Sequence, residues 1–331
     1  MPASLVDSFG RVHTSLRISV TDRCNIRCFY CMPEENVRFK PRSEILTFEE
    51  IVRFTQVAAS LGVTKLRLTG GEPLVREETP RLVQMLAAVE GIEEVALTTN
   101  GLLLAEQAAA LKAAGLRRLN ISLDTLQEET FFKISRRKGL DRVLAGIAAA
   151  KEAGFEKLRL NAIAIRGLTE AEIVPLTRFA IQNDCEIRFI EFMPLDADQA
   201  WQTDRVLTGE AMRRMLEREL GALRPRPRVD ASQPATDYEF VVGGGRVGFI
   251  HPVSQPFCGD CNRLRITAEG QLRNCLFSTI EWDARRILRG GGSDAELAEL
   301  MQACVAAKKA GHGIDSPEFL RPERAMYQIG G

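Results

Sequence analysis

Residues 15–33 read SLRISVTDRCNIRCFYCMP, and this stretch decides the fold. Its first part, SLRISV (15–20), alternates polar and apolar residues, which predicts a strand. Cys24, Cys28 and Cys31 follow directly in the spacing CxxxCxxC. Three thiolates so close in the sequence can converge on one soft metal centre. Parallel sheets and barrels place their active sites in the loops that follow their strands, so we predict a metal centre here.

The same type of strand recurs along the first half of the chain. Short β-branched runs alternate with stretches of helical period, and the predicted strands cover residues 15–20, 63–69, 93–99, 116–123, 156–165 and 185–192. Thr47 with Glu50, and Thr169 with Glu172, have the spacing of capping boxes at helix starts. Six such βα units predict a parallel sheet covered by helices, either doubly wound or curled into a full or partial barrel.

The pattern changes after Pro194. A helix is predicted over residues 208–220, and the prolines of RPRPR (224–228) predict an extended connector. We therefore divide the chain into residues 1–222 and 223–331. The second part contains two predicted hairpins, one around residues 243–245 and one turning at 269–270, and a helix capped by Ser293 and Glu296. The last residues, 311–331, have little periodicity, so we expect docking onto the rest of the protein to order them.

Composition excludes several classes of protein. Forty-four Lys and Arg balance forty-four Asp and Glu, so no overall field attracts nucleic acid or an anionic membrane, and anion binding must be local. No run of eighteen apolar residues is present, and the start has no basic segment followed by an apolar one. We expect a soluble cytoplasmic protein. Eight cysteines in a reducing compartment indicate metal or redox chemistry rather than disulfides.

A second set of cysteines lies near the C-terminus: Cys258 and Cys261, then Cys275. By itself this spacing fits zinc or iron–sulfur equally well. Neither set has an obvious fourth ligand, the nearest histidines being His13 and His251. Three cysteines suit a 4Fe-4S cluster with one open iron, whereas structural zinc usually takes four ligands. The other two cysteines, Cys185 and Cys304, continue apolar patterns and are predicted to be core thiols.

CxxxCxxC after a first βα strand, with Tyr30 before the third Cys, resembles the signature of the radical S-adenosylmethionine (SAM) superfamily. The segment Gly70–Pro73 resembles its GGEP motif. Glycines let backbone approach a ligand, and carboxylate and carbonyl acceptors can hold an ammonium group. A narrower resemblance, to the GTP 3′,8-cyclase family (molybdenum cofactor biosynthesis protein A), rests on RLTGGEPL, LTTNG, NISLDT, RFIEFMP, CGDCNRLRIT and a terminal Gly-Gly. These segments span nearly the whole chain.

The resemblance implies an α/β fold: a partial (β/α)6 TIM-like barrel, with a smaller C-terminal α+β domain closing its mouth. It also implies two 4Fe-4S clusters, one on each set of three cysteines. SAM would bind the open iron of the first cluster, and its expected contacts are Tyr30, Gly71 and Met193 through backbone and Ser122 through its side chain.

For the substrate, the resemblance implies GTP, with its guanine at the open iron of the second cluster. The family's GTP-binding positions correspond to Arg17, Arg67, Thr98, Arg159, Arg263, the backbone of Leu264, and Arg265. Arginine binds phosphate through a planar fork. Arg159 stands where the family often has Lys, so the charge is kept and the geometry differs. In this family the double glycine, here Gly330 and Gly331, reaches the active site and supports radical initiation.

The implied reaction begins when a 5′-deoxyadenosyl radical abstracts the ribose C3′ hydrogen of GTP. Attack on guanine C8 and reduction then give (8S)-3′,8-cyclo-7,8-dihydro-GTP, in the first step of molybdenum cofactor biosynthesis. The implied partners are a reductant such as flavodoxin or ferredoxin and the cyclic pyranopterin monophosphate synthase that takes the product. We expect a monomer or homodimer.

Two other functions compete with this reading. A peptide-modifying radical SAM enzyme with an auxiliary cluster would share the barrel, but NRLR (262–265) and the Gly-Gly end argue against it. A zinc-binding regulatory or nucleic-acid module could use two three-cysteine sites. The zero net charge, with only two Trp and three Tyr, disfavours that alternative.

Overall fold

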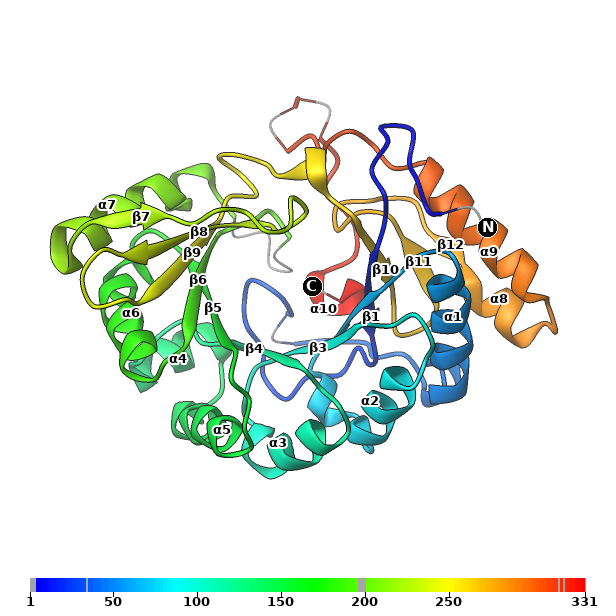
Figure 1. Ribbon diagram of the computed structural model, residues 1–331, viewed down its shortest axis with the longest axis horizontal. Coiled ribbons are helices and arrows are strands. Elements are labelled where there is room, and N and C mark those ends of the chain that lie inside the picture. Colours follow the sequence, from blue (N-terminus) through cyan, green and yellow to red (C-terminus); the bar gives the residue numbers. More distant parts are fainter. Residues whose placement is uncertain (1–3, 34, 196–200, 315, 318, 331) are drawn as a thin grey trace.

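The computed structural model describes residues 4–33, 35–195, 201–314, 316–317 and 319–330. Six strands lie in parallel in sequence order, and each lies within a predicted range: β1 (Ser15–Ser19), β2 (Lys65–Thr69), β3 (Glu94–Thr99), β4 (Arg118–Ser122), β5 (Leu158–Ala164) and β6 (Glu186–Glu191). The sheet curls around a central space and carries its helices on the outside (Figure 1). This is the partial barrel, and not the doubly wound alternative, which needs helices on both faces.

The outer layer consists of α1 (Phe48–Ser60), α2 (Thr79–Ala87), α3 (Leu104–Ala113), α4 (Glu128–Ser135), α5 (Leu140–Glu152), α6 (Ile173–Gln182) and α7 (Gly209–Leu220). The capping box at Thr47 and Glu50 is confirmed. The one predicted at Thr169 and Glu172 is wrong. Thr169 Oγ1 donates to Ile163 O, and the Glu172 carboxylate accepts from the backbone of Leu126, so other parts of the fold use both side chains.

Strands from beyond residue 222 extend the barrel sheet at both edges. At the β6 edge lie β9 (Arg246–Ile250), β8 (Ala235–Phe240) and β7 (Leu223–Pro225). At the β1 edge lie β10 (Arg263–Ile266), β11 (Gln271–Arg273) and β12 (Trp282–Asp283). Both predicted hairpins are confirmed as β8–β9 and β10–β11. The start of RPRPR forms edge strand β7, where proline is tolerated. The division at residue 222 stays a prediction.

The remaining helices pack in two places. Outside the sheet, α8 (Ala284–Arg289) and α9 (Asp294–Ala306) lie beside α1, and the capping box predicted at Ser293 and Glu296 is confirmed (Figure 1). The short helix α10 (Met326–Ile329) lies inside the barrel. Helix α10, near the end of the chain, therefore docks onto the rest of the protein, as predicted. No helix in the described ranges combines the length and apolar character needed to cross a membrane.

Alternation along the strands separates the core from the interior of the barrel. On β1 and β2, Leu16, Ile18, Leu66 and Leu68 are at most 1% exposed and belong to the apolar core under the helices. Burying such a side chain stabilises the fold by about 1.5–3 kcal/mol. Successive strand residues point to opposite faces, so Arg17, between Leu16 and Ile18, and Arg67, between Leu66 and Leu68, face inward. Cys185 and Cys304 are buried in the core, as predicted.

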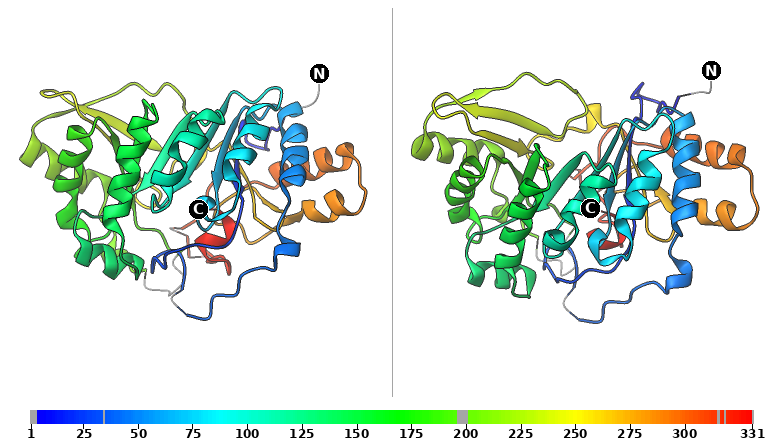
Figure 2. Two further views of the ribbon diagram at one scale, coloured as in Figure 1. Left: turned by 90° about the horizontal axis from the view of Figure 1, so that it is seen from below. Right: turned by 60° about the horizontal axis from the view of Figure 1, so that its bottom comes forward.

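A network around Asp7 fixes the N-terminal segment. Its carboxylate accepts a 2.6 Å hydrogen bond from Arg11 Nε, and Arg11 Nη1 donates to the backbone oxygens of Cys258 (2.6 Å) and Ala310 (3.0 Å). His13, fully buried, lies 3.7 Å from Asp7. This segment lies at one end of the barrel, and the blue segment that follows the first cysteines lies at the other (Figure 2).

His13 is expected to make stability depend on pH. Burial, and then the charge of Lys308, lower its pKa from 6.5 to about 4. The unfolded chain therefore binds a proton that the folded protein does not, and stability falls as the pH drops below about 7. Between pH 8 and pH 6 the expected loss is about 1 kcal/mol.

Thermal unfolding of the reconstituted protein and of a His13→Gln variant at both pH values measures this loss. The variant should lose less stability than the wild type on acidification. Equal losses would show that His13 has no such effect.

Candidate functional site

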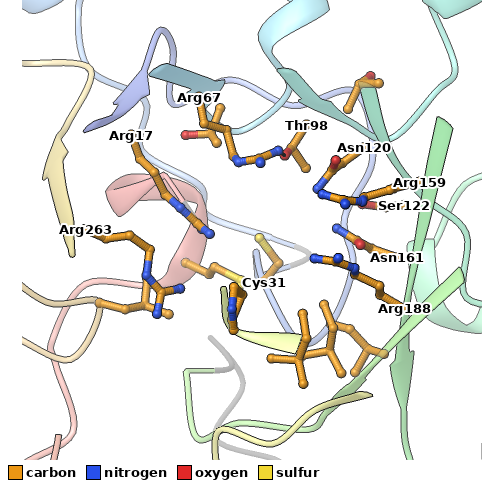
Figure 3. Close-up of a pocket in the computed structure, with 18 of the residues that line it drawn as sticks. Arg17, Cys31, Arg67, Thr98, Asn120, Ser122, Arg159, Asn161, Arg188 and Arg263 are labelled. Carbon is orange, nitrogen blue, oxygen red and sulfur yellow. Dashed lines mark hydrogen bonds between the residues drawn. The ribbon is translucent and has the colours of Figure 1, made fainter. Parts of the chain in front are cut away.

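The barrel encloses a cavity of about 530 Å³. Inward-facing residues of β1–β6 and β10 line it, and loops at the two ends of these strands complete its walls (Figure 3). Most of the predicted site residues line this cavity: Arg17, Cys24, Cys28, Tyr30, Cys31, Arg67, Gly71, Thr98, Ser122, Arg159, Met193, Arg263 and Arg265.

The first cysteine set lies at the carboxyl end of the strands, in the loop after β1. Cys24, Cys28 and Cys31 are half-buried free thiols. Burial, and then the negative charge of Glu72, raise the pKa of Cys24 to about 11, and burial raises those of the other two as well. Without a cation these thiols therefore stay protonated. Three free thiols from one short loop line the same end of the cavity, and three cysteine sulfurs are the donor set that an iron–sulfur cluster uses.

The cysteine geometry also bears on the zinc alternative. Within the described residues, no three Cys, His, Asp or Glu side chains are grouped closely enough to ligate a single metal ion. In a 4Fe-4S cluster each thiolate binds a different iron, whereas the ligands of a structural zinc site all bind one ion, so the two alternatives need different arrangements of the thiolates.

Backbone hydrogen bonds join the GGEP segment to the loop that contains the first cysteine set. Gly71 N donates to Thr21 O at 2.7 Å, and Glu72 N donates to Arg23 O at 2.8 Å. A Cβ added to Gly71 would lie 2.3 Å from Arg23 O, so no larger residue fits. In this structure Gly71 therefore allows a close approach between its own backbone and the backbone of Arg23.

Glu72 orders the next loop. Its fully buried carboxylate accepts hydrogen bonds from Thr99 Oγ1 (2.7 Å), Asn100 N (2.7 Å) and Leu74 N (3.0 Å). Burial raises its pKa to about 7. Asn100 in turn donates to the Asn25 side chain at 2.7 Å, which joins this loop to the first cysteines.

Asp124 plays a similar role after β4, and the sequence reasoning missed it. Tyr30 Oη donates to its carboxylate at 2.5 Å, and the backbone of Ile163 donates to it at 2.8 Å. Burial raises the pKa of Asp124 to about 6. Its position directly after the strand that ends in Ser122 was the signal that could have identified it.

Arginines dominate the middle of the cavity (Figure 3). Burial, and then the charges of Arg265, Arg263 and Arg67, lower the pKa of Arg17. The pKa of Arg67 falls to about 9, first through burial and then through Arg118 and Arg159.

Few carboxylates offset this charge. Arg159 pairs with Glu186 at 3.0 Å, but among the described residues Arg17, Arg67, Arg263 and Arg265 form no ion pair. These cations repel one another across a buried cavity in which water screens charge poorly, so binding of an anionic ligand would be strongly favoured there.

Further charged residues of the cavity were not predicted. Arg188 on β6 is buried and pairs with Glu186 (2.6 Å) and Asp237 (3.1 Å). Arg118 pairs with Glu94, and Lys65 pairs with Asp230 at 2.8 Å. All three cations occupy inward positions on strands, so the period-two pattern already pointed to them.

The second cysteine set lies at the opposite end of the strands. Strand β10 runs parallel to β1, with Arg263 opposite Ser15. Cys258 and Cys261 precede β10, whereas the first set follows β1, and Cys275 follows the antiparallel strand β11. The two sets therefore lie at the two ends of one cavity.

The three thiols of the second set are not part of the cavity wall, but their neighbours Phe257, Asn262 and Leu276 are. All three are free, and Arg263 and Lys308 offset the effect of burial, lowering the pKa of Cys261 to about 6. Burial raises the pKa of Cys258, so the cationic neighbours favour the thiolate at Cys261 in particular, and the three sulfurs again form the donor set that an iron–sulfur cluster uses.

The remaining predicted residues lie on β10 and in the tail. The side chain of Leu264 is fully buried in the core, so only its backbone could serve a ligand. Gly330 ends α10 with φ +67, and its carbonyl accepts a 2.7 Å hydrogen bond from Arg265 Nη1. A Cβ there would lie 2.6 Å from Thr69 Oγ1. Gly331 lies outside the described residues.

Known proteins resemble the chain over its whole length. The family described as Radical SAM superfamily matches residues 18–180, and Molybdenum Cofactor Synthesis C matches residues 185–314. A GTP 3′,8-cyclase of Rhodopirellula baltica is 55% identical and aligns with 100% of this chain and 93% of its own length. One from Mycolicibacterium smegmatis is 46% identical, over 99% and 92% of the two chains.

Solved structures show the same fold at lower identity. Streptococcus suis SuiB bound to S-adenosylmethionine superimposes with a TM-score of 0.61 at 16% identity, over 87% of this chain and 68% of its own. Radical SAM enzymes use a 4Fe-4S cluster and SAM, and the carboxyl end of the barrel offers the three cysteines for such a cluster. By sequence and fold, the chain belongs to the GTP 3′,8-cyclase family of the radical SAM superfamily.

Proposed function

We propose that the protein cyclises GTP to (8S)-3′,8-cyclo-7,8-dihydro-GTP, the first step of molybdenum cofactor biosynthesis. The observation that carries the proposal is one cavity whose middle holds arginines that pair with no carboxylate among the described residues, with three free cysteines toward each end. Relatives at 44–55% identity named GTP 3′,8-cyclase support the same activity.

At the carboxyl end, Cys24, Cys28 and Cys31 would hold the first cluster. When bound and reduced, that cluster supplies the electron that cleaves SAM to methionine and a 5′-deoxyadenosyl radical. The chain contributes position: Glu72 and Asp124 tie the neighbouring loops together, and Tyr30, Gly71, Ser122 and Met193 line the wall where SAM would lie.

In the middle, the arginines would bind the triphosphate. Arg17 and Arg67 have no carboxylate partner among the described residues, so phosphate oxygens can take their hydrogen bonds without breaking an ion pair. Thr98 already accepts a 3.4 Å hydrogen bond from Arg67. Arg159 shares Glu186 with Arg188, so it reaches the same space with its charge partly offset.

At the amino end, Cys258, Cys261 and Cys275 would hold a second 4Fe-4S cluster, and the guanine of GTP would bind its open iron. The absence of a fourth predicted ligand and the cationic surroundings of Cys261 support this assignment. GTP would then lie between the second cluster and SAM, with its ribose facing the radical source.

The proposal includes two protein partners. A flavodoxin or ferredoxin would supply the electron that reduces the first cluster. The product would pass to the cyclic pyranopterin monophosphate synthase. We propose a cytoplasmic monomer or homodimer.

Anaerobic incubation of the reconstituted protein with SAM and dithionite tests the function. GTP is expected to give both 5′-deoxyadenosine and a cyclised nucleotide, whereas ATP and a cysteine-containing peptide should give no modified product. Formation of a modified peptide, with GTP left unchanged, would favour the peptide-modifying alternative.

A further inference from the structure

Lys308 extends from the end of α9 into the base of the second cysteine set. Its side chain is buried, with the residue only 5% exposed. Nζ donates to Arg263 O at 2.9 Å and to Cys261 Sγ at 3.5 Å. The backbone of Lys308 is held by a hydrogen bond to Val305 O, so the ammonium group is aimed at the sulfur from a fixed point.

No carboxylate among the described residues pairs with this ammonium group. The ionisable groups that influence it most are the thiols of Cys261 and Cys275 and the guanidinium of Arg263. His13 lies nearby and is neutral near pH 7. A buried ammonium is costly unless an anion accompanies it. The anion that this place offers is the sulfur of the second cysteine set.

The first cysteine set has different, mixed surroundings. The buried carboxyl groups of Glu72 and Asp124 lie near Cys24 and Cys28, but Arg27 also lies near Cys24, and Asn100 Nδ2 donates to Cys24 Sγ at 3.8 Å. Positive charge and N–H···S hydrogen bonds stabilise the more negative, reduced state of a cluster, and negative charge opposes it. The two chemically similar cysteine sets therefore differ: the first has both a cation and buried carboxyl groups beside it, whereas Cys261 of the second has the cations Arg263 and Lys308.

We propose that Lys308 is a positioning residue of the second cluster: its ammonium group donates to the Cys261 sulfur and raises the cluster's reduction potential. This inference rests on the proposed function, because it takes Cys258, Cys261 and Cys275 as cluster ligands. Its consequence is that the second cluster holds an electron more readily than it would without this ammonium group.

The variant Lys308→Met tests the charge, and Lys308→Arg restores it. Lys309→Met is the matched control, because the Lys309 side chain is exposed. Its backbone oxygen accepts a hydrogen bond from Arg11, and the substitution keeps that oxygen. All variants are made in a background with Cys24, Cys28 and Cys31 changed to alanine, so that only the second cluster is observed.

Iron and sulfide content and the midpoint potential from an EPR redox titration are the measurements. We expect Lys308→Met to lower the potential, Lys308→Arg to recover most of it, and Lys309→Met to leave it unchanged. An unchanged potential in Lys308→Met with a full cluster would overturn the proposal.

A second variant covers loss of the cluster. If Lys308→Met binds no iron, Lys308→Gln, which keeps a donor without the charge, should show the lowered potential, and a wild-type value there would overturn the proposal. If the background protein with intact Lys308 binds no iron at all, the second cluster itself is refuted. That outcome is distinct from failure of the Lys308 role.

Discussion

Replacing Cys31 by alanine is expected to abolish 5′-deoxyadenosine formation, whereas Cys261→Ala should retain slow SAM cleavage and give no cyclised nucleotide. The two cysteines lie at opposite ends of the cavity, so each substitution should remove one centre and leave the other. Iron and sulfide should fall by roughly half in each variant. Activity should fall by at least about 1,000-fold, as expected when the radical source or the substrate anchor is lost.

Cys185→Ala is the control, because Cys185 is a core thiol away from the cavity. It should keep full iron content and turnover. If either single alanine removed all the iron, the two cysteine sets would have to serve one shared centre. That result would contradict the assignment to opposite ends.

Removal of Gly330 and Gly331 is expected to abolish cyclisation while folding, iron content and SAM binding persist. Deletion removes the carbonyl that Arg265 holds inside the barrel. Gly330→Val should act similarly, because its Cβ would meet Thr69 Oγ1 at 2.6 Å and its backbone has φ +67. A β-branched residue in that conformation costs about 1–3 kcal/mol.

Gly154→Ala separates backbone strain from loss of the tail contact. Gly154 has φ +81, but an added Cβ would meet nothing within 4 Å. This control should lose some stability and keep its activity. Undiminished turnover in the truncated protein would show that the tail has no part in the reaction.

The sequence predicted the barrel well because each strand carries its own local signal. Alternation placed all six strands of the first half, and the turn at Gly270, with φ +87, marked the β10–β11 hairpin. The capping box at Thr169 and Glu172 failed because contacts distant in the sequence took both side chains. Local spacing predicts a capping box reliably only where no residue distant in the sequence competes for the two side chains.

The site was predictable in its residue types and less so in its arrangement. Motifs identified the cysteines and several of the arginines, but the ends of the cavity at which they lie depend on β10 joining β1 in parallel. Strands β1 and β10 are separated by about 250 residues, and no local sequence pattern indicates that two such distant strands pair. Arg188 and Asp124 lie inside two of the quoted motifs, RFIEFMP and NISLDT, but neither was assigned a role, although strand alternation and strand ends contained the signal.

Deuterium transfer from GTP tests the central claim most directly. The reconstituted wild-type protein is incubated anaerobically with SAM, reductant and GTP deuterated at C3′, and both products are analysed by mass spectrometry. Our account predicts one deuterium in 5′-deoxyadenosine and none at C3′ of the cyclised nucleotide. Unlabelled 5′-deoxyadenosine together with unchanged GTP would contradict it, leaving a radical SAM enzyme with a different substrate.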